Sequence, residues 1–350
     1  MRMPLAAVRK MPPSVAGGLL RRNEFYLLLV IVAFVVAITI VNPAFFTVEN
    51  MFDLIRSSSG MAILAVGFFF VLLSGGIDIS FPAVAIVAQY ITVNAIISLG
   101  IDNLWLAFAI SSAVGIAFGA VNAFFISVFR IPTFIVTLAT MNIFHGAMLE
   151  FVGTKAINAG QLPNAFKGFG LADILALHRA DGTTYGLSVF FLVLVGVILV
   201  TWVILKYTVL GRVIYAMGGN MEAVKRSGFN IRRTQFFIYC YVGFLASIMG
   251  IIHVSLIRYS NATYIIDSEL LHVIAAVILG GASILGGSGT LTGTLLGVVM
   301  ISILEKNLVL LGLSSYWQQF FVGLIIVLGV SITHIQKRIQ GRRSLALARE

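Results

Sequence analysis

The sequence has very few charged residues for its length. Of its 350 residues, 10% are Asp, Glu, Lys or Arg and 59% are hydrophobic, and the mean hydropathy is +1.04. This balance excludes an ordinary water-soluble globular domain. It is typical of a chain built from membrane-spanning helices of roughly 17–25 apolar residues each. We therefore expect an all-α, polytopic integral membrane protein.

Cysteine and the usual catalytic patterns are scarce as well. The single cysteine, Cys240, excludes a disulfide within the chain and a metal site built from cysteines. The five histidines lack a His-Glu-x2-His spacing, and the Gly-rich residues 286–293 lack the lysine of a phosphate-binding loop. We expect no catalytic residues, no metal and no cofactor on this chain, so another chain must supply the energy for any work it does.

Ten apolar segments are the candidate membrane spans. They cover residues 25–41, 58–73, 79–99, 104–129, 131–151, 186–205, 235–257, 269–285, 290–311 and 316–333. The second and eighth are short and run into Gly-Gly pairs, a pattern typical of the broken or re-entrant helices of transport pathways. Residues 71–80 resemble residues 277–287, which leaves two alternatives: an internal repeat, or Gly-Gly turns that arose independently.

The net charge of +10 reflects basic residues that cluster at span ends. They form no stripe with interleaved aromatics, so nucleic acid is not an expected partner, whereas the lipid bilayer is. Basic residues favour the cytoplasmic side. We expect a cytoplasmic segment at 1–24, one transmembrane domain at 25–335 and a cytoplasmic tail at 336–350. Within that domain, 206–234 form a cytoplasmic loop and 153–185 an extracytoplasmic loop.

Polar residues after the first Gly-Gly pair mark a candidate pathway. Gly75 and Gly76 permit a sharp turn, and Asp78 and Ser80 precede the third span. One interpretation is that Asp78 or Ser80 caps that helix. The other is that the broken backbone lines a solute path, and the two are compatible.

The fifth segment contains unusual polarity for a membrane span. Asn142 and His145 share one helical face, and Thr137 lies off its edge. Such residues are costly in a bilayer unless they face protein or a wet cavity. A hydrogen-bonded seam between helices and a pathway lining both remain open.

The eighth segment begins with acidic residues and ends in the second Gly-Gly pair. Glu269 and His272 are three residues apart, so they can touch on a helix. They indicate a capped helix entrance or a gate. Gly280 and Gly281 complete the set of candidate pathway residues.

The longest polar interruption in the second half is residues 211–233. Its positive charge is ordinary for a cytoplasmic loop and carries no functional weight. Gly218 and Gly219 can break the chain, Asn220 can cap a helix, and residues 221–227 form a short helical piece that ends at Gly228. A short helix held between two spans suits insertion into a groove of a partner.

Several long motifs now point to a known family. The chain contains GGIDIS at 75–80, IPTFIVTLATMNIFHG at 131–146, GRVIYAMGGNMEAVKRSGFN at 211–230, HVIAAVILGGASILGGSGTLTGTLLG at 272–297 and GLSSYWQQFFVG at 312–323. With these motifs it resembles the permease subunits of the ribose, xylose and autoinducer-2 type of bacterial ABC importers. The resemblance covers nearly the whole chain after about residue 42.

The resemblance implies a type II importer fold with about ten spans in the bacterial inner membrane. It implies a second permease, two cytoplasmic ABC ATPase domains that hold ATP and magnesium, and a periplasmic solute-binding protein. The coupling helix inserted in the ATPase would include Gly219, Asn220, Glu222, Ala223, Ser227 and Gly228. The implied solute is a monosaccharide or a similar small polar compound. A nucleoside, autoinducer-2 or branched-chain amino-acid permease is the nearer alternative, and an ion-coupled secondary transporter the more distant one.

Overall fold

The computed structural model describes residues 23–178, 184–262, 267–310, 316–317, 319–324 and 326–327. Nearly all of the predicted segment 1–24, the whole predicted tail 336–350 and part of the predicted span 316–333, including residues 328–333, lie outside these residues.

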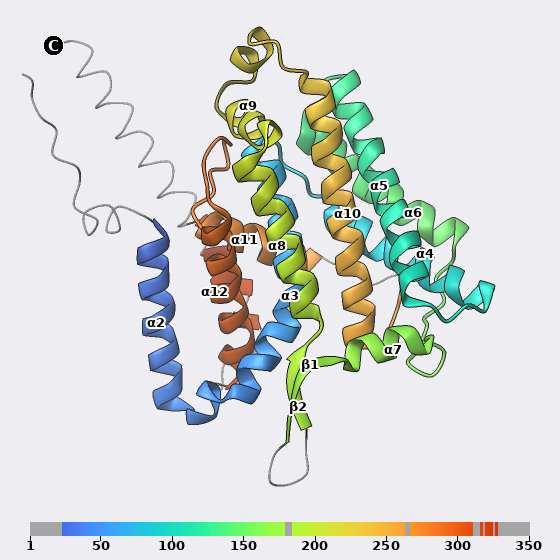
Figure 1. Ribbon diagram of the computed structural model, residues 1–350, viewed down its shortest axis with the longest axis vertical. Helices are drawn as coiled ribbons and strands as arrows, with labels where there is room; N and C mark the ends of the chain where they lie inside the picture. The colour runs from blue at the N-terminus through green and yellow to red at the C-terminus, as the bar shows by residue number, and fades with distance from the viewer. Residues whose placement is uncertain are drawn as a thin grey trace, which may run out of the picture.

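The described chain is mostly helical (Figure 1). In chain order its elements are α2 (Asn23–Val41), the 3-10 helix η1 (Pro43–Phe46), α3 (Val48–Leu73), α4 (Phe81–Leu99), α5 (Leu104–Val128), α6 (Thr133–Phe151), α7 (Asn164–Leu171), β1 (Asp173–His178), β2 (Thr184–Ser188), α8 (Phe190–Tyr207), α9 (Val209–Arg226), α10 (Ile231–Ile257), α11 (Asp267–Leu279) and α12 (Leu291–Leu310).

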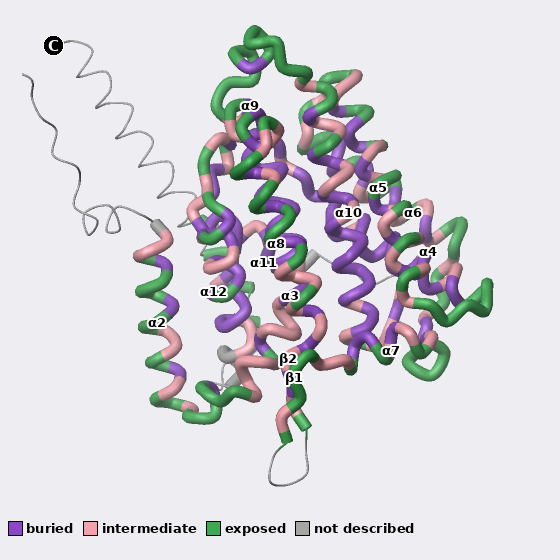
Figure 2. Tube along the Cα trace, in the orientation of Figure 1, coloured by how far each residue is buried: buried purple, intermediate pink, exposed green. Residues whose placement is uncertain are grey.

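Helices α3, α4 and α10 form the centre of the bundle. Most of their residues are buried, whereas α2, α5, α6 and α8 keep large exposed apolar faces (Figure 2). Long apolar helices with exposed apolar faces are stable when lipid or another membrane chain covers them. The arrangement therefore supports a membrane protein whose central helices are shielded by its outer ones.

Helix α5 packs closely against the central helix α10, backbone against backbone. A Cβ atom on Gly115 would lie 2.2 Å from the carbonyl oxygen of Gly243, and one on Gly119 would lie 2.2 Å from that of Tyr239. Glycine spaced by four residues allows two helix backbones to approach in this way. The Ser111 hydroxyl adds a 3.0 Å hydrogen bond to the carbonyl oxygen of Ser247.

The two ends of the bundle differ in structure. Helix α9 and the turn after it project at one end, and the antiparallel hairpin β1–β2 projects at the opposite end, next to α7 (Figure 1). We call these the α9 end and the hairpin end. The hairpin was not predicted, because the alternation in such a short segment was hidden among scattered apolar pieces. The all-α expectation holds for the bundle but not for this small element.

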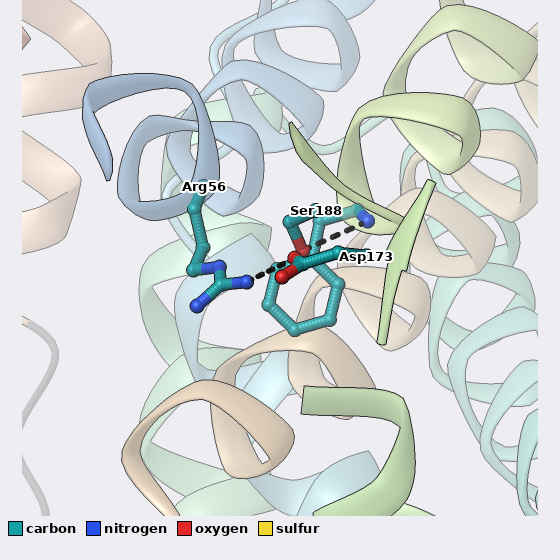
Figure 3. Close-up of polar contacts among 4 residues, drawn as sticks. Arg56, Asp173 and Ser188 are labelled. Carbon is teal, nitrogen blue, oxygen red and sulfur yellow. Dashed lines mark hydrogen bonds and ion pairs between the residues drawn. The ribbon is translucent and has the colours of Figure 1, made fainter. Parts of the chain in front are cut away.

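An ion pair ties the hairpin to the bundle. The Arg56 guanidinium of α3 pairs with the carboxylate of Asp173, the first residue of β1. Figure 3 shows these two side chains pointing toward each other, with Ser188 of β2 beside Asp173. The Ser188 hydroxyl in turn accepts a 3.3 Å hydrogen bond from the backbone N–H of Phe190. The start of α8 is thus held beside the hairpin.

Seven described helices are long and apolar enough to cross a membrane, so the predicted count of ten is not confirmed. The eighth predicted segment is the main difference. It becomes α11, which has 13 residues and reaches only about 20 Å at 1.5 Å per residue. A span needs about 30 Å, so α11 is too short to cross alone.

Helix α3 is longer than predicted, since it begins at Val48 and not at residue 58. Its first turns contain Glu49, Asp53 and Arg56, which broke the apolar pattern on which the prediction relied. Thr47 caps this start, because its hydroxyl accepts a 3.3 Å hydrogen bond from the backbone N–H of Asn50.

The two Gly-Gly pairs end their helices in the same way. At the end of α3, the N–H of Gly75 bonds to the carbonyl of Leu72 and the N–H of Gly76 to that of Val71. At the end of α11, Gly281 and Ala282 repeat both bonds three and five residues back, to Ile278 and Val277. This is the Schellman arrangement, and Gly75 and Gly281 adopt the positive φ that it requires, 82° and 85°.

Beyond these two turns the chain takes different courses. Helices α11 and α12 pack as a tight hairpin in which a Cβ atom on Gly280 would lie 2.4 Å from the carbonyl oxygen of Gly293. After α3 the non-helical residues 74–80 lead to α4, which packs mainly against α10, α5 and α6 rather than on α3. Residues 71–80 and 277–287 are therefore alike at the helix ends and differ beyond them.

Candidate solute pathway and coupling helix

Residues 74–80 form a buried break between α3 and α4. Because a buried backbone must find hydrogen-bond partners, side chains of α6 supply them. The Thr133 hydroxyl accepts a 3.0 Å hydrogen bond from the N–H of Ile77. The Thr137 hydroxyl accepts from the N–H of Ile79 at 3.2 Å and donates to the carbonyl of Ile77 at 3.3 Å. Thr137 thus belongs to a hydrogen-bonded seam between segments.

Asp78 and Ser80 organise the start of α4. One carboxylate oxygen of Asp78 accepts 2.7 Å hydrogen bonds from both the backbone N–H and the hydroxyl of Ser80, and Asp78 also accepts from the backbone N–H of Phe81. The side chain of Ser80 makes no capping bond to the described first turn. It accepts instead from the Asn122 amide of α5 at 2.8 Å. Of the two predicted caps, Asp78 is the one that acts, and Ser80 links α4 to α5.

The other polar residues of α6 are separated from one another. Thr140 is buried, and its hydroxyl donates to the carbonyl of Val136 in its own helix at 3.0 Å. Asn142 is exposed and donates to the carbonyl of Leu138, also in its own helix, at 2.9 Å. The His145 ring nitrogen Nε2 lies 2.9 Å from the carbonyl oxygen of Ala262. Asn142 and His145 therefore form no joint site within the described residues.

A cavity of about 220 Å³, lined by both apolar and polar side chains, opens between α3, α10, α11 and α12. Because it adjoins residues next to Arg56, we call it the hairpin-side cavity. Ser302 of α12 is 2% exposed, and its hydroxyl has no hydrogen-bond partner among the described residues. Such a cavity is suited to a small solute with hydroxyl groups. Its polar lining consists of Ser57, Ser58, His253, Glu269, Ser302, Glu305 and Lys306.

Charged groups beside this cavity are paired across helices. The Nδ1 atom of His272 lies 2.7 Å from a carboxylate oxygen of Glu305, on α12. The spacing suggested that His272 can touch Glu269, but its 2.7 Å contact is with Glu305, because the packing of α11 on α12 brings Glu305 opposite. The Lys306 ammonium donates to the carbonyl of Asp53 at 2.9 Å, which fixes the end of α12 to α3.

A larger cavity of about 650 Å³ lies at the α9 end. It is enclosed by the turn between α5 and α6, the second half of α9 and the start of α10. Gly75, at the end of α3, and Thr133 also line it. Its charged lining residues are Arg130, Glu222, Lys225 and Arg232, so its surface carries a net positive charge. We call it the α9-side cavity.

Helix α9 consists of two pieces. Asn220 has non-helical backbone angles, φ −160° and ψ 96°, and its side-chain oxygen accepts a 3.0 Å hydrogen bond from the N–H of Ala223. This caps a second piece, residues 221–226, which we call the coupling piece. Gly228 ends it, with φ 85° and a 3.1 Å bond from its N–H to the carbonyl of Lys225. Asn220 and Gly228 thus have the geometry that the sequence predicted.

The first piece of α9 was predicted as part of a loop and is helical. Val213, Met217, Val224 and Ile231 form a small apolar cluster that holds both pieces against the start of α10. Val213 and Met217 are four residues apart, a helical spacing that could have revealed this piece. Outside the cluster the coupling piece is exposed, including Glu222, Ala223 and the following Ser227.

Several site residues were missed at the level of sequence. Asn122 of α5 bonds to Ser80. Gln89 of α4 joins Ser260 at 3.1 Å and the His253 ring at 3.0 Å. Each of the residues Gln89, Asn122 and His253 is an isolated polar residue in a long apolar span. That isolation was the available signal, since polar groups in membrane helices usually face protein or a cavity.

Comparison with known proteins connects this geometry to a class of transporter. The family model described as branched-chain amino acid transport system / permease component matches residues 50–330. The match includes both Gly-Gly turns, both cavities and both pieces of α9. No solved structure matches the chain.

Curated relatives are similar along nearly their whole length. The ribose import permease protein RbsC of Escherichia coli (strain K12) is 34% identical over 317 residues, which are 90% of this chain and 94% of the relative. RbsC of Bacillus subtilis (strain 168) is 33% identical, over 85% of this chain and 88% of the relative. The autoinducer 2 import system permease protein LsrC of Enterobacter sp. (strain 638) is 34% identical, over 95% and 90%.

Proposed function

The chain belongs to the family of branched-chain amino acid transport system permease components, and we propose that it is the membrane permease of an ATP-driven importer for a monosaccharide of the ribose class. The substrate assignment rests on the 34% identity to a ribose import permease over 90% of the chain. The Ser302 hydroxyl lines the hairpin-side cavity and has no partner among the described residues, which agrees with a solute that offers hydroxyl groups.

ATP and magnesium belong to partner chains in this proposal. Two ABC ATPase domains bind at the α9 end, where the coupling piece with Glu222 and Ala223 is exposed and capped at both ends. A periplasmic binding protein delivers the solute at the hairpin end. A second permease covers part of the exposed apolar surface of α5, α6 or α8.

The two cavities give the solute a place on each side of the bundle. We assign the hairpin-side cavity, with Glu269 and Ser302, to the periplasmic half and the α9-side cavity to the cytoplasmic half. ATP binding by the partner chains changes which side is open, and this requires contacts that differ between the two states. Asp78, Thr137 and the first Gly-Gly turn lie in or beside the buried break of residues 74–80, whose Gly75 lines the α9-side cavity.

The orientation follows from the charges at the α9 end. Arg212, Lys225, Arg226, Arg232 and Arg233 are all exposed there, and such clusters stay in the cytoplasm. We therefore place the α9 end and both chain termini in the cytoplasm of a bacterium and the hairpin in the periplasm.

The test is solute uptake by proteoliposomes that contain this permease, its ATPase and its binding protein. We expect ribose uptake that requires ATP. The replacement Ser302→Leu fills the hairpin-side cavity and should lower the rate of uptake at least about tenfold. This corresponds to a rise of about 1.4 kcal/mol in the activation free energy of transport. Ser302→Ala, which keeps the cavity open, should retain most of it.

Two results would reject parts of this proposal. Uptake driven by an ion gradient without ATP would reject the ABC mechanism. ATP-driven uptake of autoinducer-2 but not ribose would keep the mechanism and replace the substrate.

A further inference from the structure

Three segments that are far apart in the sequence meet through glycine backbones at the α9 end. They are the end of α3 at Gly75, the first piece of α9 at Gly218, and the loop between α11 and α12 at Gly286 and Gly287. In Figure 1 this loop extends from α11 and α12 toward α9. We call the four residues the glycine junction.

The distances leave no space for a side chain at the junction. A Cβ atom on Gly218 would lie 2.0 Å from the carbonyl oxygen of Leu73 and 2.2 Å from the backbone nitrogen of Gly287. One on Gly286 would lie 2.6 Å from the Cα atom of Gly75. These contacts join backbone to backbone, so no flexible side chain lies between the segments.

Two hydrogen bonds fasten the same contact. The N–H of Gly287 donates to the carbonyl of Leu73 at 2.9 Å. The Tyr215 hydroxyl, one helical turn before Gly218, donates to the carbonyl of Gly289 at 3.2 Å. Burial raises the pKa of Tyr215 above its ordinary value, so the phenol remains a donor at physiological pH.

The junction lies next to the coupling piece and is connected to the walls of both cavities. Gly218 is two residues before the kink at Asn220, where the coupling piece begins. Gly75 lines the α9-side cavity. The loop with Gly286 connects α11 to α12, and these helices carry Glu269 and Ser302 of the hairpin-side cavity. A shift of α9 therefore acts on the walls of both cavities.

We propose that Gly218 is a positioning residue through which movement of the coupling piece displaces α3 and the α11–α12 hairpin together, and so reshapes the hairpin-side cavity. The inference rests on the proposed ABC mechanism. Packed backbones have low compressibility, so they transmit a displacement that flexible side chains would absorb by changing rotamer. The absence of a side chain at Gly218 is the feature that makes the link direct.

A thiol-labelling experiment tests this link without a solute. Cys240→Ala removes the single native thiol, and Ser57→Cys places one in the hairpin-side cavity of the permease–ATPase complex in nanodiscs. We expect the rate of maleimide labelling to differ about fivefold or more between the nucleotide-free and the ATP–vanadate state. A fivefold change corresponds to the lower end of typical coupling energies. Adding Gly218→Ala should abolish this difference.

The matched control is Gly196→Ala, inside helix α8. There a Cβ atom meets nothing within 4 Å in the described part of the chain, so the nucleotide-dependent difference should remain. The proposal is overturned if Gly218→Ala keeps the full difference, or if the parent complex shows none.

A second variant decides the matter if Gly218→Ala does not assemble. Tyr215→Phe keeps the ring and removes only the hydrogen bond to Gly289, so the difference should shrink while the complex stays intact. Full retention in that variant overturns the proposal. Since labelling needs no sugar, failure of ribose uptake rejects the proposed substrate and leaves this test valid.

Discussion

Single hydroxyl groups hold the broken backbone inside this bundle. Thr137 is fully buried, and its hydroxyl serves both the N–H of Ile79 and the carbonyl of Ile77. Both backbone groups lie in residues 74–80, where no helix satisfies them. A buried polar group that loses its partner costs about 1–3 kcal/mol.

We therefore expect Thr137→Val to lower the free energy of unfolding by about 1–3 kcal/mol or more. Thr140→Val is the matched control, because that hydroxyl is also buried but bonds only to carbonyls of its own helix among its described contacts. Its effect should stay below about 1 kcal/mol. Thermal unfolding of the two variants in detergent measures the difference, and equal midpoints would contradict the role of Thr137.

Some of these residues could be predicted and others could not. Asp78, Ser80 and Thr137 were found because polar groups are costly in apolar spans. Their partners were not, since no helical period indicates that Asn122 of one span meets Ser80 of another. The contact of His272 with Glu305, which comes from another helix, has the same origin.

At the scale of elements, the coupling piece is short, exposed and capped at both ends. Glu222 is exposed on this piece, and Gly228 adopts a positive φ that costs other residues about 1–2 kcal/mol. The apolar cluster around Val213 and Met217 attaches this piece to α10. The coupling piece and the start of α10 are thus joined by apolar packing.

We expect Glu222→Lys and Gly228→Val to reduce sugar uptake per ATP hydrolysed at least about fivefold, within the usual range of coupling energies. Arg212→Gln changes a charge in the same loop outside the coupling piece and should have little effect. The ratio of uptake to ATP hydrolysis in proteoliposomes gives the answer. An equal loss in all three variants would assign the effect to the charge of the loop.

Element boundaries were predictable where apolar residues and caps agree. Asn220 and Gly228 indicated the coupling piece, and the Gly-Gly pairs indicated the ends of α3 and α11. The first piece of α9 and the polar start of α3 were missed, because each is helical outside the apolar stretches that define spans. The β-hairpin was missed as well, and the residue that ties it to the bundle, Arg56, is distant in sequence.

For the whole molecule, the distribution of charge predicts one orientation in the membrane. In a Cys240→Ala background, Ser227→Cys at the α9 end should be shielded from an impermeant maleimide added to intact cells. Asn158→Cys, exposed near the hairpin end, should be labelled, because basic loops remain in the cytoplasm. Permeabilised cells supply the control, since both thiols should then react. The reverse pattern in intact cells would invert the topology.

The general architecture followed from composition, whereas the assembly of the bundle did not. Apolar segments and the order of motifs indicated a polytopic permease. The contact of Gly218 with Gly287, like that of Gly115 with Gly243, depends on how helices cross. A single sequence contains glycines at many positions and does not state which of them face another backbone.

The ion pair between α3 and the hairpin also constrains biogenesis. Arg56 and Asp173 are 117 positions apart in the chain. At about 5–20 residues per second, translation makes the aspartate roughly 6–23 s after the arginine. During that interval the outer end of α3 has a cation whose final partner is not yet synthesised. Helix α3 therefore inserts before its ion pair with the hairpin can form. A ribosomal pause before the hairpin would lengthen the period in which α3 lacks this contact.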